Sequence, residues 1–125
     1  IMDEFDLIRK YFAPISSLES QYLLNDGAVF KPKMNLDYVV STDTIVEKIH
    51  FTGDESPNLI AKKALRTNLS DLAAMGADPE FYSLSISLPK EKAKNFIKCF
   101  AKGLKEDQKE YNIKLLGGDL TASFN

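Results

Sequence analysis

Segment 81–88 alternates large apolar side chains with serines along almost its whole length. Because successive side chains of a strand point to opposite faces, this pattern predicts a strand with one apolar face and one small polar face. The apolar face needs helices to bury it, and the serine face is suited to close approach by another layer of structure. We therefore expect a sheet with helices packed on one face.

Two amphipathic helices flank this strand. In segment 57–75 the apolar residues follow one stripe at helical spacing, and Gly76 ends the pattern. The second helix begins at Pro89, and its lysines lie opposite its apolar residues. We interpret this lysine run as a solvated face rather than a binding site; it comprises Lys92, Lys94, Lys98, Lys102 and Lys105.

Shorter patterns complete the chain. Segment 3–12 has helical spacing, segments 27–30 and 37–46 are expected to pair as a hairpin, and segment 113–116 is a last strand. This order predicts an α+β fold: a mixed or antiparallel four-stranded sheet with helices on one face. A chain of 125 residues with 44% hydrophobic content fits one globular domain, so we treat residues 1–125 as a unit.

Charge and cysteine content exclude several functional classes. Sixteen Lys and Arg against eighteen Asp and Glu give a net charge of -2, which disfavours nucleic acid and anionic membrane surfaces as partners. No apolar stretch approaches the ~20 residues that a membrane-spanning helix needs. The single cysteine, Cys99, cannot form an internal disulfide, and we interpret it as a core or subsurface thiol. We expect a soluble, cytoplasmic protein.

Four aspartates adjoin apolar segments, where a charged side chain is unfavourable unless it is solvated, paired or bound. They are Asp26, Asp43, Asp71 and Asp119. A single Asp at the end of a strand is commonly a turn or cap residue that hydrogen-bonds its own backbone. Asp43 fits that interpretation least, because a carboxylate within a β-branched run must be exposed, paired or bound to a cation.

If these carboxylates converge, divalent cations would have to neutralise their repulsion, and oxygen ligands suit magnesium. The hydroxyls of Ser41 and Thr42 beside Asp43 would add further oxygens. Because magnesium is commonly bound by carboxylates together with substrate phosphates, such a cluster indicates a nucleotide phosphate site.

Three further residues carry weaker signals. Gly117 and Gly118 would let backbone N–H groups approach phosphate oxygens, although a Gly-Gly-Asp sequence is more often an ordinary turn. His50 is the only histidine; as a lone residue it is usually structural or merely exposed, and substrate contact is the alternative. No Walker-type loop or protein-kinase signature is present.

Four blocks occur together in one order, and the most specific is the ten-residue run 68–77, Asn-Leu-Ser-Asp-Leu-Ala-Ala-Met-Gly-Ala. The others are Val-Val-Ser-Thr-Asp-Thr at 39–44, Val-Glu with His-Phe within 46–51, and Gly-Gly-Asp at 117–119. In this combination the chain closely resembles the N-terminal domain of the thiamine-monophosphate kinases. That family belongs to a superfamily with aminoimidazole ribonucleotide synthetase and selenophosphate synthetase.

The resemblance implies ATP-dependent phosphorylation of thiamine monophosphate to thiamine diphosphate, with Mg2+ as cofactor and direct in-line transfer. It also implies a homodimer in which the sheets of two subunits join into a barrel, and a C-terminal domain that this chain does not contain. It assigns no general acid or base. By position, the implied magnesium ligands are Asp26, Ser41, Thr42, Asp43, Asp71 and Asp119; Gly118 and Asp119 would contact ATP, and His50 the thiamine phosphate.

Three positions differ from the usual family pattern: Asn25, Lys48 and Leu120. Two alternatives therefore stay open beside the kinase. One is a superfamily member that phosphorylates another acceptor with the same magnesium and ATP apparatus. The other is a non-catalytic module for dimerisation or nucleotide binding.

Overall fold

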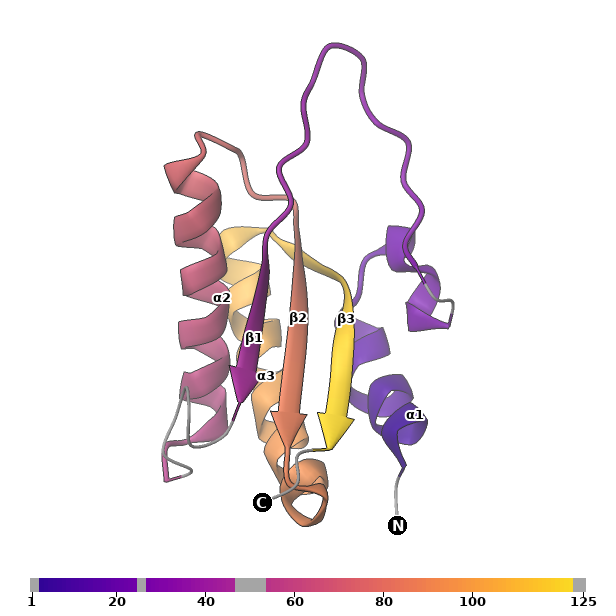
Figure 1. The fold of residues 1–125 in the computed structure, drawn as a ribbon, viewed down its shortest axis with the longest axis vertical. Coiled ribbons are helices and arrows are strands. Elements are labelled where there is room, and N and C mark those ends of the chain that lie inside the picture. The colour runs from indigo at the N-terminus through magenta and orange to yellow at the C-terminus, as the bar shows by residue number, and fades with distance from the viewer. Residues whose placement is uncertain (1–2, 25–26, 47–53, 123–125) are drawn as a thin grey trace.

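The computed structural model describes residues 3–24, 27–46 and 54–122. Three strands, β1 (Thr42–Val46), β2 (Phe81–Leu88) and β3 (Lys114–Ala122), form one sheet in the order β1-β2-β3 (Figure 1). Helix α2 (Pro57–Ala74) lies between β1 and β2 in the chain, and α3 (Ala93–Tyr111), preceded by the 3-10 turn η4 (Lys90–Lys92), lies between β2 and β3. The two long helices and β2 confirm the elements expected from periodicity.

The sheet differs from the expected one because it has three strands in the described part of the chain, and both pairs are parallel. A helix separates each strand from the next, and such a crossover returns the chain to the same end of the sheet, which makes neighbouring strands parallel. The prediction of a mixed or antiparallel four-stranded sheet was therefore wrong in strand number and direction. The α+β content and the helices on one face are confirmed (Figure 1).

The expected hairpin between segments 27–30 and 37–46 is also absent, since the structure assigns no strand between residues 27 and 41. Pro32 lacks an N–H, and Asn35 has a left-handed backbone with φ 61°, so the chain turns there. The two flanks meet through the rings of Phe30 and Tyr38, whose centroids are 5.2 Å apart, rather than through a strand ladder.

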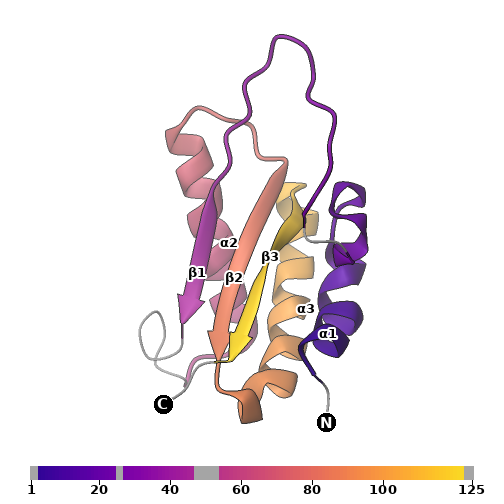
Figure 2. The ribbon, with the colours of Figure 1, turned by 45° about the vertical axis from the view of Figure 1, so that its right-hand side comes forward.

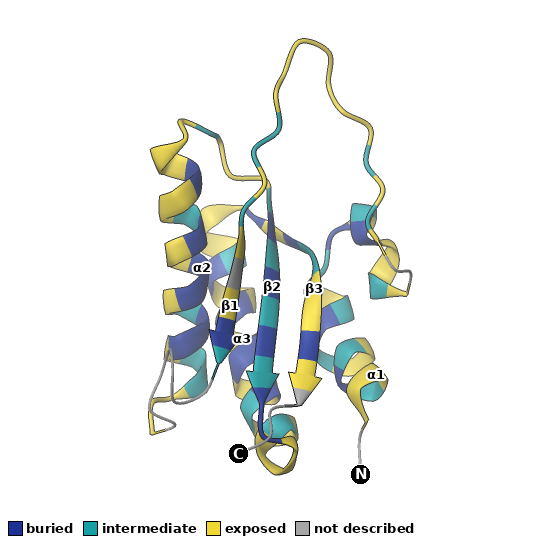
Figure 3. Ribbon diagram, viewed as in Figure 1, coloured by how far each residue is buried: buried dark blue, intermediate teal, exposed yellow. Residues whose placement is uncertain are grey.

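The core lies between the sheet and the two long helices. Along β2 the side chains alternate between buried and half-buried, and Tyr82, Leu84, Ile86 and Leu88 are the buried set (Figure 3). Helices α2 and α3 approach each other closely at Gly103, where a Cβ would lie 2.5 Å from the backbone oxygen of Asn58. We call strands β1 to β3 with α2 and α3 the helix-covered sheet.

Residues 3–24 and 27–41 form what we call the N-terminal arm. Its helical part is a series of short turns beside α3 and β3 (Figure 2). Two contacts fasten it: the Ser17 N–H donates to the Leu115 carbonyl at 2.8 Å, and Gln108 Nε2 donates to the Ile15 carbonyl at 3.0 Å. The turns are α1 (Glu4–Leu7), the π-helical η1 (Ile8–Phe12) and the 3-10 turns η2 (Ala13–Ile15) and η3 (Leu18–Leu23).

Within the described ranges, no helix is both long enough and apolar enough to span a bilayer. Cys99 on α3 is exposed, so its interpretation as a core or subsurface thiol was wrong. The helix places its apolar stripe elsewhere, on Ile97, Phe100 and Leu104, all of which are fully buried.

Candidate functional site

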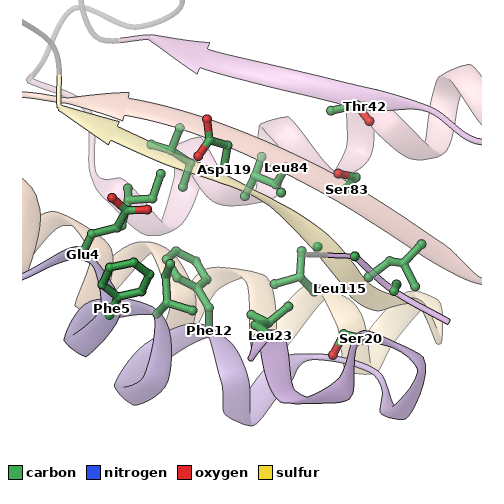
Figure 4. Close-up of a pocket in the computed structure, with 18 of the residues that line it drawn as sticks. Glu4, Phe5, Phe12, Ser20, Leu23, Thr42, Ser83, Leu84, Leu115 and Asp119 are labelled. Atoms are coloured by element: carbon green, nitrogen blue, oxygen red, sulfur yellow. The ribbon is translucent and has the colours of Figure 1, made fainter. Parts of the chain in front are cut away.

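A cavity of about 470 Å³ lies between the N-terminal arm and the sheet (Figure 4). Its strand side includes Thr42 from β1, Ser83 from β2, and Gly118 and Asp119 from β3. Three of the residues predicted for the site, Thr42, Gly118 and Asp119, therefore line one cavity, although they lie up to 77 positions apart in the sequence, between positions 42 and 119. We therefore take this cavity as the candidate functional site.

The strand register explains why these residues meet. Thr44 pairs with Ser85, and Ser85 pairs with Asp119, so three oxygen-bearing side chains form a row across the sheet. Because paired residues share a face, this row lies on the face opposite the buried Leu84 and Ile86. Neighbouring strands are about 4.8 Å apart, which puts β1 and β3 about 10 Å from each other across β2. Of this row Asp119 lines the cavity, and the paired Thr42 and Ser83, two positions earlier on β1 and β2, line it as well.

Packing of β3 against β2 also requires glycine at position 118, in addition to the predicted contact of Gly118 with ATP. A Cβ at this position would lie 1.6 Å from the carbonyl oxygen of Leu84, so β3 can pass β2 in this register only with glycine. The register at Gly118 in turn sets where the next residue, Asp119, meets the row. The glycine therefore positions the carboxylate through the backbone.

The opposite wall of the cavity comes from the arm, and it is largely apolar. Phe5, Phe12 and Leu23 face the strands across the cavity, with the carboxylate-bearing Glu4 beside Phe5 (Figure 4). Phe12 is 6% exposed and belongs to the core, whereas Phe5 is 69% exposed. Sequence reasoning missed this wall because the helical spacing of Phe5 and Phe12 indicates a packed face equally well.

The remaining predicted site residues are not brought to this cavity by the described part of the chain. Ser41 immediately precedes β1, and Asp71 is an exposed residue of α2; neither lines the cavity. Asp43 pairs with Leu84 in the register, and its side chain lies outside the description. Asp26 and His50 also lie outside the described residues. Among described side chains, no group of three His, Cys, Asp or Glu residues could hold a metal ion.

One buried polar residue, Asn68, contacts the backbone of Ser41 and lies three positions before Asp71. Asn68 on α2 is 2% exposed, and its Nδ2 donates to the Ser41 carbonyl at 3.3 Å. The sequence shows Asn68 three positions before Asp71 at the edge of the apolar stripe, but it does not show the contact with Ser41, 27 residues away.

Two ion pairs lie away from the cavity, between α2 and α3. Arg66 contacts both carboxylate oxygens of Asp107, at 3.1 and 3.3 Å, and Lys62 contacts Glu106 at 2.8 Å. The hydrogen bond to Asp107 raises the pKa of Arg66, and the hydrogen bond from Lys62 lowers the pKa of Glu106. These cations join helices, so they are not available as a ready anion site.

The hydroxyl of Tyr82 joins the sheet to the fastening of the arm. It donates to Gln108 Oε1, the same side chain whose Nε2 holds the Ile15 carbonyl. Burial raises the pKa of Tyr82, so the hydroxyl stays protonated and remains a donor. Gln108 thus connects the wall of the cavity to β2.

Comparison with known proteins identifies this architecture. Residues 24–125 match the family described as AIR synthase related protein, N-terminal domain. The chain belongs to this family. The matched range includes all three strands, both long helices and every strand residue of the cavity.

Members of known name are similar over nearly the whole chain. A thiamine-monophosphate kinase from Haemophilus influenzae is 42% identical over 123 residues, covering 96% of this chain and 37% of that protein. One from Bacillus subtilis is 37% identical over 126 residues, covering 98% of this chain and 38% of that protein. A crystal structure of thiamine monophosphate kinase from Aquifex aeolicus has a TM-score of 0.57 at 28% identity, covering 62% of this chain and 26% of that one. This chain thus spans less than two fifths of the length of these curated relatives.

Proposed function

We propose that this chain is the N-terminal ATP- and magnesium-binding domain of a kinase that phosphorylates thiamine monophosphate to thiamine diphosphate. The observation that carries the proposal is that Thr42, Gly118 and Asp119 line one cavity, in a chain 42% identical to a protein named thiamine-monophosphate kinase. The names of the relatives favour this acceptor over another one. A module for dimerisation alone would have no need of carboxylate and hydroxyl oxygens in one cavity.

The donor set is suited to magnesium, which prefers carboxylate and hydroxyl oxygens. Asp119 and Thr42 would hold the ions from the strands, together with Ser41, Asp43, Asp71 and Asp26, and bound magnesium would neutralise phosphate charge. Gly118 keeps the backbone of β3 open to ATP, and His50 would contact the thiamine phosphate. Phe5 and Phe12 form an apolar wall on the side of the cavity opposite the oxygens.

For in-line transfer the chain's own task is placement and charge compensation, because an acceptor phosphate oxygen is already anionic near neutral pH. No side chain of the cavity is needed as a general base. Thr42 on β1 and Asp119 on β3, two strands that lie about 10 Å apart across β2, would orient the phosphates in the cavity.

We also propose a homodimer in which the open faces of two sheets pack together into a barrel-like arrangement. On the serine face of β2, Ser85 and Ser87 do not line the cavity; they are half-buried, and their side chains are small enough for close approach of a second layer. Light scattering on the complete gene product is expected to give twice the mass of one chain, and a monomer at micromolar concentration would reject this part.

The test of the activity is phosphorus NMR of the complete gene product with ATP, Mg2+ and thiamine monophosphate. Wild-type protein should form thiamine diphosphate, and Asp119→Asn should lower the rate at least ~100-fold, the scale on which loss of one electrostatic group acts. Asp78→Asn removes an exposed carboxylate between α2 and β2 and should keep the wild-type rate. A folded wild-type protein that forms no thiamine diphosphate would reject the proposed reaction.

A further inference from the structure

Asn68 makes a contact that joins α2 to the beginning of β1. Its side chain is 2% exposed, and its Nδ2 donates to the Ser41 carbonyl at 3.3 Å. Ser41 directly precedes β1, which is an edge strand of the described sheet. The amide therefore holds the chain at the point where it enters the sheet.

The oxygen of the same amide differs from its nitrogen. Asn68 Oδ1 is buried and has no hydrogen-bond partner within the residues that the structure describes. A buried acceptor without a donor costs about 1–3 kcal/mol, and leucine, which has nearly the same shape, would fill this space without that cost. An amide kept at the expense of stability points to a role other than packing.

The residues that Asn68 connects indicate what that role is. Asp71 follows it by three positions on α2, about one helical turn, and Ser41 leads directly into Thr42 and Asp43. Four of the proposed magnesium ligands thus lie on the two segments that this one side chain ties together.

We infer that Asn68 is a positioning residue for the magnesium site. It holds the Ser41 carbonyl against α2, so the entry to β1 and the turn of α2 that carries Asp71 keep one relative placement. Outer residues that orient metal ligands typically change metal affinity by about 10–100-fold when they are replaced. The inference rests on the proposed magnesium site, and it is independent of which acceptor is phosphorylated.

Mn2+ binding, followed by electron paramagnetic resonance on the complete gene product, tests this inference directly. Asn68→Leu is expected to weaken Mn2+ binding by about 10–100-fold. Its thermal stability should change little, because removal of the unsatisfied acceptor offsets the loss of the hydrogen bond to Ser41. Loss of metal affinity without loss of stability is a result that a merely structural asparagine would not give.

The matched control is Thr67→Val. Thr67 is the adjacent residue on the same helix, and its hydroxyl also donates to a backbone carbonyl, that of Lys63 at 2.8 Å, but its side chain is exposed. This variant loses one hydrogen bond of the same kind and should keep wild-type Mn2+ affinity. Asn68→Ser, which keeps a shorter donor, should give intermediate affinity and is decisive if the leucine variant does not fold.

The outcomes separate the two proposals. If the Asn68 variants bind Mn2+ within about twofold of wild type, the positioning role is overturned and the kinase proposal stands. If wild-type protein binds Mn2+ and Asn68→Leu does not, but no thiamine diphosphate is formed, the positioning role is supported and the proposed reaction is rejected. A folded wild-type protein that binds no Mn2+ overturns both.

Discussion

Phe100 and Phe5 are the same residue type in opposite surroundings. Phe100 on α3 is fully buried between the sheet and the helices, whereas Phe5 on α1 is 69% exposed. The same contrast separates the helix-covered sheet from the N-terminal arm. Eight of the eleven exposed large hydrophobic side chains of the described residues belong to the arm: Phe5, Leu18, Tyr22, Leu24, Val29, Met34, Leu36 and Val40.

The difference shows which part of the chain can stabilise itself. The sheet region buries its apolar side chains within its own elements, and burial of apolar surface is the main source of stability. The arm contributes Leu7, Phe12 and Ile15 to the core and is fastened by a few hydrogen bonds, but it leaves much of its other apolar surface in contact with solvent. Such a surface is expected where another layer of protein packs, in agreement with the proposed dimer.

The largest effect should come from truncating the two phenylalanines. Phe100→Ala is expected to lower the free energy of unfolding by about 3–5 kcal/mol, because it removes a fully buried ring and leaves a cavity. Phe5→Ala should cost less than about 0.5 kcal/mol, as for most exposed positions. Urea denaturation followed by circular dichroism measures both. Equal losses would mean that the arm is as well packed as the sheet region.

Replacing arginines in the two regions should give a smaller contrast. Arg66→Met leaves the 1% exposed Asp107 carboxylate without its partner; because Arg66 is itself half exposed, we expect a loss of about 2 kcal/mol. Arg9→Met breaks the solvent-exposed pair with Asp6 and should cost less than about 0.5 kcal/mol. The same denaturation series checks this. A loss at Arg9 as large as that at Arg66 would contradict the contrast.

The smallest effect concerns alkaline pH. Burial raises the pKa of Tyr82, so above the usual tyrosine pKa of about 10 the unfolded chain loses a proton that the folded chain retains. This contribution to stability is complete below pH 10 and falls by up to about 1.4 kcal/mol per pH unit above it. Thermal melts between pH 9 and 11 should show a shallower decline for Tyr82→Phe than for wild type. Tyr22→Phe, at an exposed side chain of the arm, should decline as wild type does; identical slopes for all three proteins would refute the assignment.

Local periodicity was enough to predict the elements of the sheet region. The alternation over residues 81–88 became β2, and the helical stripe over 57–75 became α2, because both patterns are set by neighbours in the sequence. The arm was harder to predict: residues 27–30 have strand-forming composition but no partner strand in the structure. A strand requires a partner as well as propensity, and propensity alone overestimated it.

The sequence contained a signal for parallel strands, but that signal was misinterpreted. Helix-forming segments separate β1 from β2 and β2 from β3, and this alternation favours parallel pairing. The prediction gave more weight to the expected hairpin between residues 27–30 and 37–46. A hairpin is antiparallel, so a mixed or antiparallel sheet was predicted.

The amino-acid sequence by itself determined the long helices, the two-faced strand β2 and the candidate oxygen ligands, because these depend on residue type and short spacing. Only the tertiary structure decided that Thr42 and Asp119 share a cavity, that Phe5 faces them, and that Asn68 holds Ser41. Those contacts join residues that are 27 or more positions apart, and their placement follows from strand register and helix packing. Register and packing are properties of the whole fold, so no local pattern contains them.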